Sequence, residues 1–259
     1  MSEYNLSLQN KVAIVTGASR GIGAAIAENL ARRGAKVAIT FTSNSSIDAT
    51  EQLVKKIKGF GTSADAIKIQ ADLRDVSSVK HVVDATRKAF GSTIHILVNN
   101  AGYLDEPKPL GTTTMEQYNN IFDLNVRAVF VMTEAVAPYL PKSGGRIINI
   151  GSIAGRKAFP QFPLYCGSKA AVEGFTRCWA AELGPQGHTV NQVNPGPVET
   201  DMIRAMPTEI TQLQTKSTPF ENRFGQPQEI AAIVGFLAED SGRWITGQVI
   251  SASGGMEMY

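Results

Sequence analysis

Short apolar runs alternate along the chain with longer segments whose apolar residues recur at helical spacing. The runs that predict strands, most of them continuously apolar, are Val12–Thr16, Lys36–Phe41, Ala66–Gln70, Ile94–Val98, Arg146–Ile150, Val190–Val193 and Gln248–Ser251. The segments that predict helices are Ile22–Arg33, Ala49–Lys58, Val76–Phe90, Met115–Tyr139, Leu164–Leu183 and Gln228–Ala238. Continuously apolar strands are typical of a sheet that is covered on both faces. The pattern therefore predicts an α/β fold, with a seven-stranded parallel sheet between two layers of helices.

The segment Thr200–Phe224 interrupts this regular pattern. It follows a Pro-Gly-Pro turn and shows only weak helical periodicity. Because long irregular segments inside compact domains are usually functional or mobile, we expect residues 200–224 to form a lid over a substrate. The alternative is a surface excursion without function. No linker or compositional break occurs elsewhere, so residues 1–259 are predicted to form one domain.

The stretch Val126–Leu140 is apolar on nearly all sides, which is typical of a buried helix rather than an amphipathic surface helix. Either the sheet or another subunit could cover it, and the sequence leaves both possibilities open.

Composition and charge exclude several classes of function. Hydrophobic residues make up 43% of the chain and charged residues 19%, as in ordinary soluble proteins. The net charge is +2, and the mixed charges form no basic stripe that would bind nucleic acid or a membrane. Cys166 and Cys178 fall on one predicted helix about 18 Å apart, too far for a disulfide. Free thiols, together with the lack of a signal-like or membrane-spanning apolar segment, predict a cytoplasmic protein.

A glycine-rich turn follows the first predicted strand and runs directly into a helix. Its sequence is Thr16-Gly17-Ala18-Ser19-Arg20-Gly21-Ile22-Gly23. Glycines let the backbone approach a pyrophosphate closely, and a helix N-terminus supplies unpaired N–H groups and positive potential. A simple turn would also use glycine, but the strand, turn and helix context favours a dinucleotide site.

Four polar residues are candidates for catalysis. Tyr165 and Lys169 are four residues apart and share one face of a predicted helix. A neighbouring cation is expected to lower the pKa of the tyrosine toward the working range. Ser152 follows a strand, where its hydroxyl could hold a carbonyl oxygen, and Asn125 is polar within an apolar helix. Taken singly, these residues could equally be a chance pair, a cap serine and a structural amide.

Taken with the glycine turn, further motifs make the chain resemble the short-chain dehydrogenase/reductase family in its single-domain form. Asp72-Leu73 follows the third predicted strand, Asn99-Asn100-Ala101-Gly102 the fourth, and Pro195-Gly196-Pro197-Val198-Glu199-Thr200 the sixth. Their order and spacing match the family from about Leu8 to Gly255. Within the family, the chain is most similar to fungal polyketide-type ketoreductases and 3-oxoacyl-carrier-protein reductases. Where the family usually has Asp-Gly-Gly, this chain has Ala252-Ser253-Gly254-Gly255, which puts only local turn detail in doubt.

The resemblance implies a Rossmann-like doubly wound domain that binds NADP. The residues it assigns to the cofactor are Gly17, Ser19, Arg20, Gly21, Ile22, Gly23, Ser43, Asn44, Asp72, Leu73, Asn99, Ala101, Gly102, Tyr165, Lys169, Pro195, Gly196, Val198 and Thr200. The end of the second strand carries no carboxylate before Asp48, and a carboxylate there would repel the 2′-phosphate of NADP. Hydroxyl and amide groups of Ser43 and Asn44, with the charge of Arg20, could instead donate to that phosphate. In the alternative interpretation, Arg20 is a solvated charge and the other two residues only form a turn.

By the same resemblance, the chain is expected to be an NADPH-dependent enzyme that reduces a ketone or aldehyde by hydride transfer. Tyr165 would donate the proton, Lys169 would tune it and hold the ribose, Ser152 would orient the carbonyl, and Asn125 would hold a relay water. Secondary metabolism or 3-oxoacyl reduction is the expected setting, and the substrate itself is left open. A non-catalytic NADP-binding regulator of the same fold and a related epimerase or dehydratase are the alternatives.

The remaining expectations concern metals and assembly. His81, His95 and His188 are far apart in sequence, so no metal site is predicted. The family resemblance implies a homotetramer built on the helices that start near Met115 and Leu164.

Overall fold

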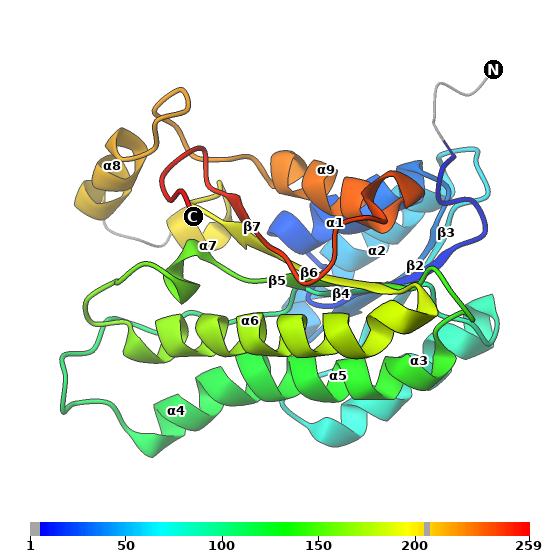
Figure 1. The fold of residues 1–259 in the computed structure, drawn as a ribbon, viewed down its shortest axis with the longest axis horizontal. Coiled ribbons are helices and arrows are strands. Elements are labelled where there is room, and N and C mark those ends of the chain that lie inside the picture. Colours follow the sequence, from blue (N-terminus) through cyan, green and yellow to red (C-terminus); the bar gives the residue numbers. More distant parts are fainter. Residues whose placement is uncertain (1–5, 205–207) are drawn as a thin grey trace.

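The computed structural model describes residues 6–204 and 208–259, which fold around one seven-stranded parallel sheet (Figure 1). The strand order is β3-β2-β1-β4-β5-β6-β7. The strands are β1 (Val12–Val15), β2 (Lys36–Phe41), β3 (Asp65–Gln70), β4 (Ile96–Asn99), β5 (Arg146–Ile150), β6 (Thr189–Pro195) and β7 (Val249–Ala252). The predicted doubly wound α/β fold is therefore confirmed. β4 begins two residues later than predicted, because residues before Ile96 still belong to the connection from the preceding helix.

Helices cover both faces of the sheet, as the apolar strands require. One face carries α1 (Gly21–Arg32), α2 (Ile47–Lys58) and α9 (Pro227–Ala238), and the other carries α3 (Val76–Phe90), α5 (Ala128–Val136) and α6 (Pro163–Leu183) (Figure 1). Ile26, Leu30 and Val234 are fully buried on the first face, and Val82 and Met132 on the second. Each such aliphatic side chain contributes roughly 1.5–3 kcal/mol when it is buried.

The predicted helix Met115–Tyr139 is interrupted. α4 (Met115–Phe122) ends in a π-helical turn at Asp123–Arg127, α5 follows, and a 3-10 turn closes the segment at Ala137–Tyr139. A π-helical turn inserts one residue into the helix, and in a segment that is apolar on nearly all sides the resulting shift in register leaves no visible break in the pattern. The turn contains Asn125, one of the candidate site residues.

The predicted lid is more regular than its sequence suggests. Its described residues form α7 (Asp201–Arg204) and α8 (Thr208–Lys216), which lie above the carboxyl ends of the strands in Figure 1. Residues 205–207 of the predicted lid lie outside the described residues.

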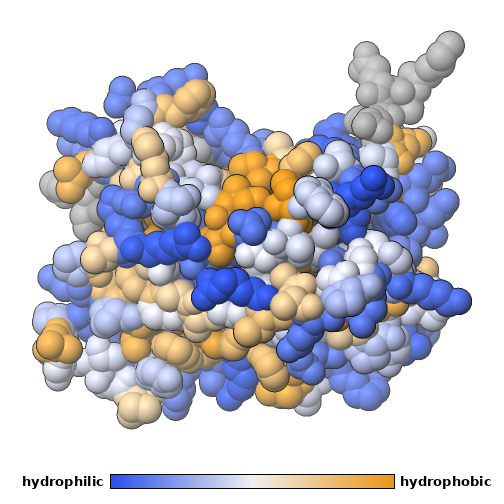
Figure 2. Space-filling view, viewed as in Figure 1, coloured by the Kyte–Doolittle hydropathy of each residue, from blue (hydrophilic) through white to orange (hydrophobic). Residues whose placement is uncertain are grey.

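Two of the groups of apolar side chains that remain on the surface lie on the sheet edge and on the helix layers. Figure 2 shows one group over β7 and α9, where Phe236 is exposed and Ile233, Ile245 and Ile250 are partly buried. The other group lies on α5 and α6, whose inner faces pack on the sheet. Among the described helices, none is long and apolar enough to span a membrane.

The polarity of the strands fixes where a site can form. β1 pairs with β2 on one side and with β4 on the other, and the chain order runs in opposite directions from this point. In open parallel sheets, ligands bind at the carboxyl ends of the strands beside such a switch point. The loops that follow β1, β4, β5 and β6 all begin at this edge of the sheet.

Candidate active site

The glycine turn after β1 packs directly against the loop after β4. Gly17 has a φ of +61°, and a Cβ placed on it would lie 2.8 Å from the Ala101 Cα. A Cβ on Gly23 would lie 2.5 Å from the Gly17 carbonyl oxygen and would also collide with the Asn100 side chain. Only glycine fits at these two points, because the crowding atoms include backbone that cannot move aside. The predicted cofactor residues of the two loops are therefore brought together.

Asn100 and Thr16, which the sequence analysis did not assign to the site, hold these two loops together. The Asn100 Nδ2 donates to the carbonyl oxygens of Thr16, at 2.8 Å, and Gly17, at 3.0 Å. The Thr16 hydroxyl accepts from the backbone N–H groups of Asn100 and Ala101. Asn100 lies inside the Asn-Asn-Ala-Gly motif, so its position in that motif was the available signal.

The N-terminus of α1 is open toward the glycine turn. Arg20 occupies the N-cap position without a side-chain hydrogen bond to the helix, and the first turn holds no acidic residue. The first N–H groups of a helix have no partner within it, and together with the helix dipole they suit a phosphate group. The crowded glycines and this open helix end fit the pyrophosphate of a dinucleotide.

The loop after β6 meets the glycine turn from the other side. A Cβ on Gly21 would lie 3.3 Å from the Thr200 methyl group, and Val198 is buried beneath. Arg20 forms an ion pair with Asp201 at 3.6 Å, and both side chains are largely exposed. This ion pair thus connects Arg20, the arginine predicted to bind the 2′-phosphate, to the first residues of the predicted lid.

The end of β2 presents hydroxyl and amide groups, as the sequence predicted. The Ser43 hydroxyl contacts those of Ser45, at 2.7 Å, and Ser46, at 3.2 Å, and the Asn44 Oδ1 accepts from Gln70 at 2.8 Å. Asn44 belongs to a short 3-10 turn, Asn44–Ser46, and Ser43 is its N-cap residue. Both residues therefore form a turn, as the alternative interpretation proposed.

The Asp72-Leu73 pair follows β3 at the edge of a cavity of about 320 Å³. Leu73 is buried, and the Asp72 carboxylate accepts two close hydrogen bonds from Arg74, at 3.1 and 2.7 Å. The hydrogen bond from Arg74 holds the pKa of Asp72 below its usual range, although burial acts in the opposite direction. Residues that line the cavity are Thr42, Asp72, Arg74, Gly102, Tyr103, Asn120 and Leu124.

The candidate catalytic residues gather where β4, β5 and α6 meet. The Lys169 Nζ donates to the Ile150 carbonyl oxygen at 3.1 Å and lies 5.7 Å from the centre of the Tyr165 ring. A Cβ on Gly102 would be 3.3 Å from that Nζ and 3.5 Å from the Asn125 Oδ1. Gly102 therefore leaves a narrow space that both Lys169 and Asn125 face.

Asn125 has hydrogen-bond partners within the protein. Its Oδ1 accepts from the Tyr103 N–H at 2.8 Å, while its Nδ2 donates to the Tyr103 carbonyl at 2.9 Å and to the Ser168 hydroxyl at 3.1 Å. The amide thus holds the loop that follows Gly102, which is the structural role considered as an alternative. The space beside Gly102 is still shared with Lys169.

Ser152 lies at the point where β5 ends. Its hydroxyl accepts from the Ala154 N–H at 3.1 Å and caps the 3-10 turn Ile153–Gly155. Its own N–H donates to the Asn194 Oδ1 at 3.1 Å. The Ser152 hydroxyl also acts on the Tyr165 phenol as a hydrogen-bonding group that favours a lower pKa. The structure therefore brings Ser152 and Tyr165 close together.

The expected lowering of the pKa of Tyr165 is wrong for this structure. Burial raises the pKa of Tyr165 above its ordinary value, and the hydrogen bond with Ser152 only opposes that rise. Burial also lowers the pKa of Lys169 to about 8. The lysine therefore loses part of its tendency to carry charge. Desolvation is the largest cause of both shifts.

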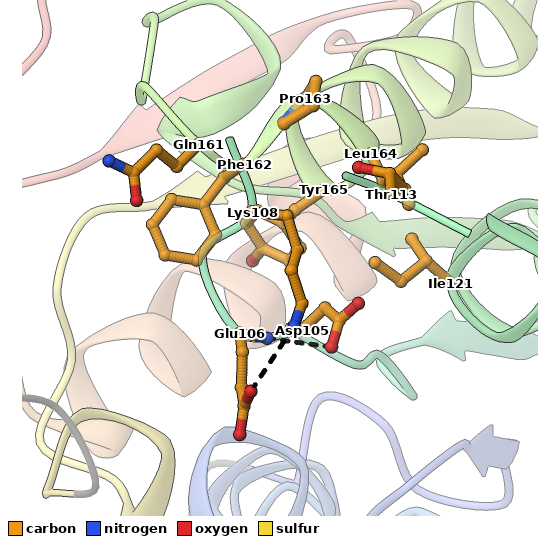
Figure 3. A pocket seen from close by; sticks show the side chains of 10 residues that line it. All are labelled: Asp105, Glu106, Lys108, Thr113, Ile121, Gln161, Phe162, Pro163, Leu164 and Tyr165. Atoms are coloured by element: carbon orange, nitrogen blue, oxygen red, sulfur yellow. Dashed lines mark hydrogen bonds and ion pairs between the residues drawn. The ribbon is translucent and has the colours of Figure 1, made fainter. Parts of the chain in front are cut away.

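A pocket opens beside Tyr165 between α6, α4 and the loop after β4 (Figure 3). Ile121, Phe162 and Leu164 form its apolar wall, and Lys108 lies 3.8 Å from the Glu106 carboxylate. The Lys108 N–H donates to the Gln161 carbonyl, which ties the loop to the start of α6. The other lining residues are Asp105, Thr113, Gln161, Pro163 and Tyr165. The sequence interpretation missed this loop because it carries no periodic pattern.

The histidines take part in backbone contacts. The His95 Nδ1 accepts from the Val12 N–H at 3.1 Å, and the His188 Nδ1 accepts from the Gly145 N–H at 2.9 Å. Residues 6–204 and 208–259 contain no group of three or more His, Cys, Asp or Glu side chains that could hold a metal ion.

Comparisons with known proteins agree with this geometry. A family model described as enoyl-(acyl carrier protein) reductase matches residues 17–257. Dehydrogenase OXI1 of Cochliobolus heterostrophus is 44% identical, over 85% of this chain and 97% of its own. Hydroxynaphthalene reductase arp2 of Aspergillus fumigatus is 40% identical, over 95% and 92%. A short chain dehydrogenase from Burkholderia cenocepacia, solved in complex with NADP, superposes with a TM-score of 0.89 at 41% identity, over 96% and 99%.

Proposed function

Because the chain belongs to the short-chain dehydrogenase/reductase family, we propose that it uses NADPH to reduce a ketone or aldehyde to an alcohol, with Tyr165 as the proton donor. The observation that carries this proposal is the convergence of Tyr165, Ser152 and Lys169 on one point at the carboxyl ends of the strands. NADPH would supply the hydride when bound.

The glycine turn and the open end of α1 would hold the pyrophosphate of the cofactor. Ser43, Asn44 and Arg20 would hold the 2′-phosphate, since the end of β2 carries hydroxyl and amide groups and no carboxylate. The relative from Burkholderia cenocepacia was solved with NADP, which supports this preference.

The raised pKa of Tyr165 suits a proton donor. Burial keeps the phenol protonated at neutral pH, so the proton is available when negative charge develops on the substrate oxygen. Ser152 would donate a second hydrogen bond to the same oxygen and stabilise that charge. After the transfer, the phenolate would lie close to Lys169, whose protonation then becomes more favourable.

Lys169 and Asn125 would support this transfer from the side of Gly102. Lys169 would hold the ribose hydroxyls of the cofactor, and Asn125 would hold a water that returns protons to Lys169. The narrow space beside Gly102, which both side chains face, supports the pairing of these roles.

Reduction of polyketide-type aromatic ketones in secondary metabolism is the setting that we favour over 3-oxoacyl reduction. A relative over 95% of the chain is named a hydroxynaphthalene reductase. Ile121, Phe162 and Leu164 would give a hydrophobic substrate an apolar contact surface beside Tyr165. The α7 and α8 segment within residues 200–224 would close over it, and residues 1–259 would act as one domain.

We also propose that the protein works in the cytoplasm as a homotetramer. Its two cysteines are free thiols, as is usual in a reducing compartment. β7 lies at one end of the sheet with apolar side chains around it (Figure 2), and α5 carries the exposed ring of Phe130. Two such surfaces on one subunit would allow a closed tetramer.

The test compares wild type with Tyr165→Phe in NADPH oxidation against a panel of aromatic ketones, aldehydes and 3-oxoacyl thioesters. We expect turnover by wild type, slower turnover with NADH, and a loss of at least about 100-fold in kcat for the variant. NADPH binding, followed by fluorescence, should change little, because the ring is retained. Tight NADPH binding without turnover of any compound would favour the non-catalytic regulator.

A further inference from the structure

Asn194 fills a place that neither the family motifs nor the proposed mechanism assigns. It lies on β6, one residue before the Pro-Gly turn, and its side chain is completely buried. The last backbone bond between β5 and β6 runs from the Gly151 N–H to the Val193 carbonyl at 2.8 Å. Beyond it the strands separate, and the Asn194 side chain accepts the next N–H, that of Ser152, at 3.1 Å.

Every hydrogen-bonding position of the Asn194 amide is used. Its Oδ1 accepts from Ser152 and from the Gln192 Nε2 at 2.7 Å. Its Nδ2 donates to the Glu173 Oε1 at 3.0 Å and to the Tyr259 phenol oxygen at 2.8 Å. An asparagine amide offers two acceptor positions and two donors, so these four partners fix its orientation. No other side chain of this size has that combination.

The two acceptors are themselves held in place. Arg156 pairs with Glu173 at 2.8 Å, and its guanidinium lies 4.2 Å from the centre of the Tyr259 ring. Arg177 lies 3.9 Å from the second Glu173 oxygen. The Glu173 carboxylate is therefore balanced by two arginines and stays an acceptor for Asn194.

The segment that carries Tyr259 is also fastened beside Ser152. Lys157 forms an ion pair with Glu257, and the Ser251 and Ser253 hydroxyls donate to the Glu257 carbonyl. The segment 256–259 therefore lies against the loop 152–157, which begins with the catalytic serine.

The turn at Gly151 and Ser152 has no free space beside it into which it could shift. A Cβ on Gly151 would collide with the amide groups of both Asn194 and Gln192. The backbone at Gly151 and Ser152 thus lies directly on Asn194, and any shift of that amide moves Ser152.

We propose that Asn194 is a positioning residue that fixes the backbone of Ser152, and that Tyr259 and Glu173 act through it. This inference rests on the proposed function for its kinetic part, since it assumes that Ser152 orients the substrate carbonyl. A displacement of about 1 Å at a reacting group lowers catalysis by as much as about 100-fold. The anchoring itself is independent of the reaction.

A double-mutant cycle with Asn194→Ser and Ser152→Ala tests the kinetic part. We expect Asn194→Ser to lower kcat roughly 10-fold to 100-fold and to change KM less than about threefold, because Ser152 acts mainly in the transition state. In the Ser152→Ala background the same change should lower kcat less than about threefold. An equal loss in both backgrounds would mean that Asn194 is only structural, and would overturn the proposal.

Tyr259→Phe keeps the ring beside Arg156 and removes one acceptor from Asn194, so it remains informative if Asn194→Ser does not fold. We expect kcat to fall about threefold to tenfold, as for the loss of one buried hydrogen bond, and the loss should vanish in the Ser152→Ala background. Asn191→Ser is the matched control. Asn191 is an equally buried asparagine of β6 that bonds Ile245 and Gln248, away from Ser152. This variant should leave kcat unchanged.

Hydrogen exchange separates the two proposals. In a peptide covering residues 148–158, we expect the Ser152 amide to exchange faster in Asn194→Ser than in wild type and in Asn191→Ser. Unchanged exchange would overturn the inference, whatever the kinetics. Faster exchange in a protein whose wild type turns over no substrate would overturn the proposed function and leave the anchoring of Ser152 intact.

Discussion

At the scale of single residues, the active site contains groups that work against the stability of the fold. Lys169 is only 5% exposed, and burial lowers its pKa from 10.5 to about 8. Each pKa unit corresponds to about 1.4 kcal/mol, so keeping this group charged at neutral pH costs on the order of 3 kcal/mol. We therefore infer that Lys169 serves the proposed site rather than the stability of the protein.

Lys169→Met should therefore stabilise the protein while abolishing turnover. The methionine fills a similar volume without a charge, and the lost bond to Ile150 offsets about 1 kcal/mol of the gain. A net gain of about 2 kcal/mol raises Tm by roughly 5 °C at pH 7. The measurement is thermal unfolding of both proteins.

The stability that Lys169→Met gains over wild type should depend on pH in a defined direction. Between pH 8 and 10.5 the unfolded chain keeps the proton on Lys169 that the folded protein has lost. Wild type therefore gains stability from this group as the pH rises through that window. The advantage of Lys169→Met should be largest at pH 7 and should shrink toward pH 10.5. An advantage that stays constant across this range would contradict the assigned cause.

At the scale of elements, the glycine turn is fixed by how closely two loops approach. Gly23→Ala would place a methyl group 2.5 Å from the Gly17 carbonyl and 2.9 Å from the Ala18 Cα. Backbone has to shift, so we expect a loss of about 1–3 kcal/mol. The open end of α1 would shift with it, so NADPH should raise Tm less in the variant than in wild type.

Gly59→Ala is the control for that experiment. Gly59 follows α2 with a negative φ, and the nearest atom to an added Cβ is 3.4 Å away. Its stability should stay within about 0.5 kcal/mol of wild type, with a normal shift by NADPH. Equal behaviour of the two variants would show that the contact between the loops is not what makes Gly23 necessary.

The elements were predictable where local pattern and burial agree. β1, β4 and β5 are mostly apolar and buried throughout, so the sequence pattern located them within two residues. The π-helical turn at Asp123–Arg127 and the pocket loop around Asp105 were not predictable, because tertiary contacts shape them. The raised pKa of Tyr165 was missed for a related reason. Spacing along a helix reveals a neighbouring charge, whereas desolvation depends on everything that packs around the group.

At the scale of the whole molecule, the sheet brings together residues from distant parts of the chain. Gly17, Gly102, Ser152 and Thr200 all follow strands whose carboxyl ends point to one edge. Beneath the site, buried polar side chains also connect residues from distant parts of the chain. The Asn99 Nδ2 donates to Asn149 at 2.9 Å, and Asn149 in turn donates to the Thr176 hydroxyl. The role of Asn194 depends on contacts that exist only in the folded sheet, so the sequence alone could not assign it.

The outer faces of the molecule lead to the last prediction. On α5 and α6, the Phe130 ring is 43% exposed and lies 5.8 Å from the Phe175 ring and 6.1 Å from the Trp179 ring. Exposed aromatic groups of this kind are enriched at interfaces between subunits. If this face pairs with the same face of a second copy, a charge at Phe130 would be buried twice at the two-fold axis.

We therefore expect wild type to elute as a tetramer in size-exclusion chromatography with light scattering, and Phe130→Glu to elute as a dimer held by the β7 edge. Leu213→Glu provides the control, because Leu213 is more exposed, at 66%, but lies on α8, which belongs to neither face. That variant should remain a tetramer. The fold of each subunit should be unchanged in Phe130→Glu, since the ring lies outside the core, and circular dichroism checks this. A wild-type monomer, or a Phe130→Glu tetramer, would mean that α5 and α6 do not form the interface and that the aromatic cluster has another use.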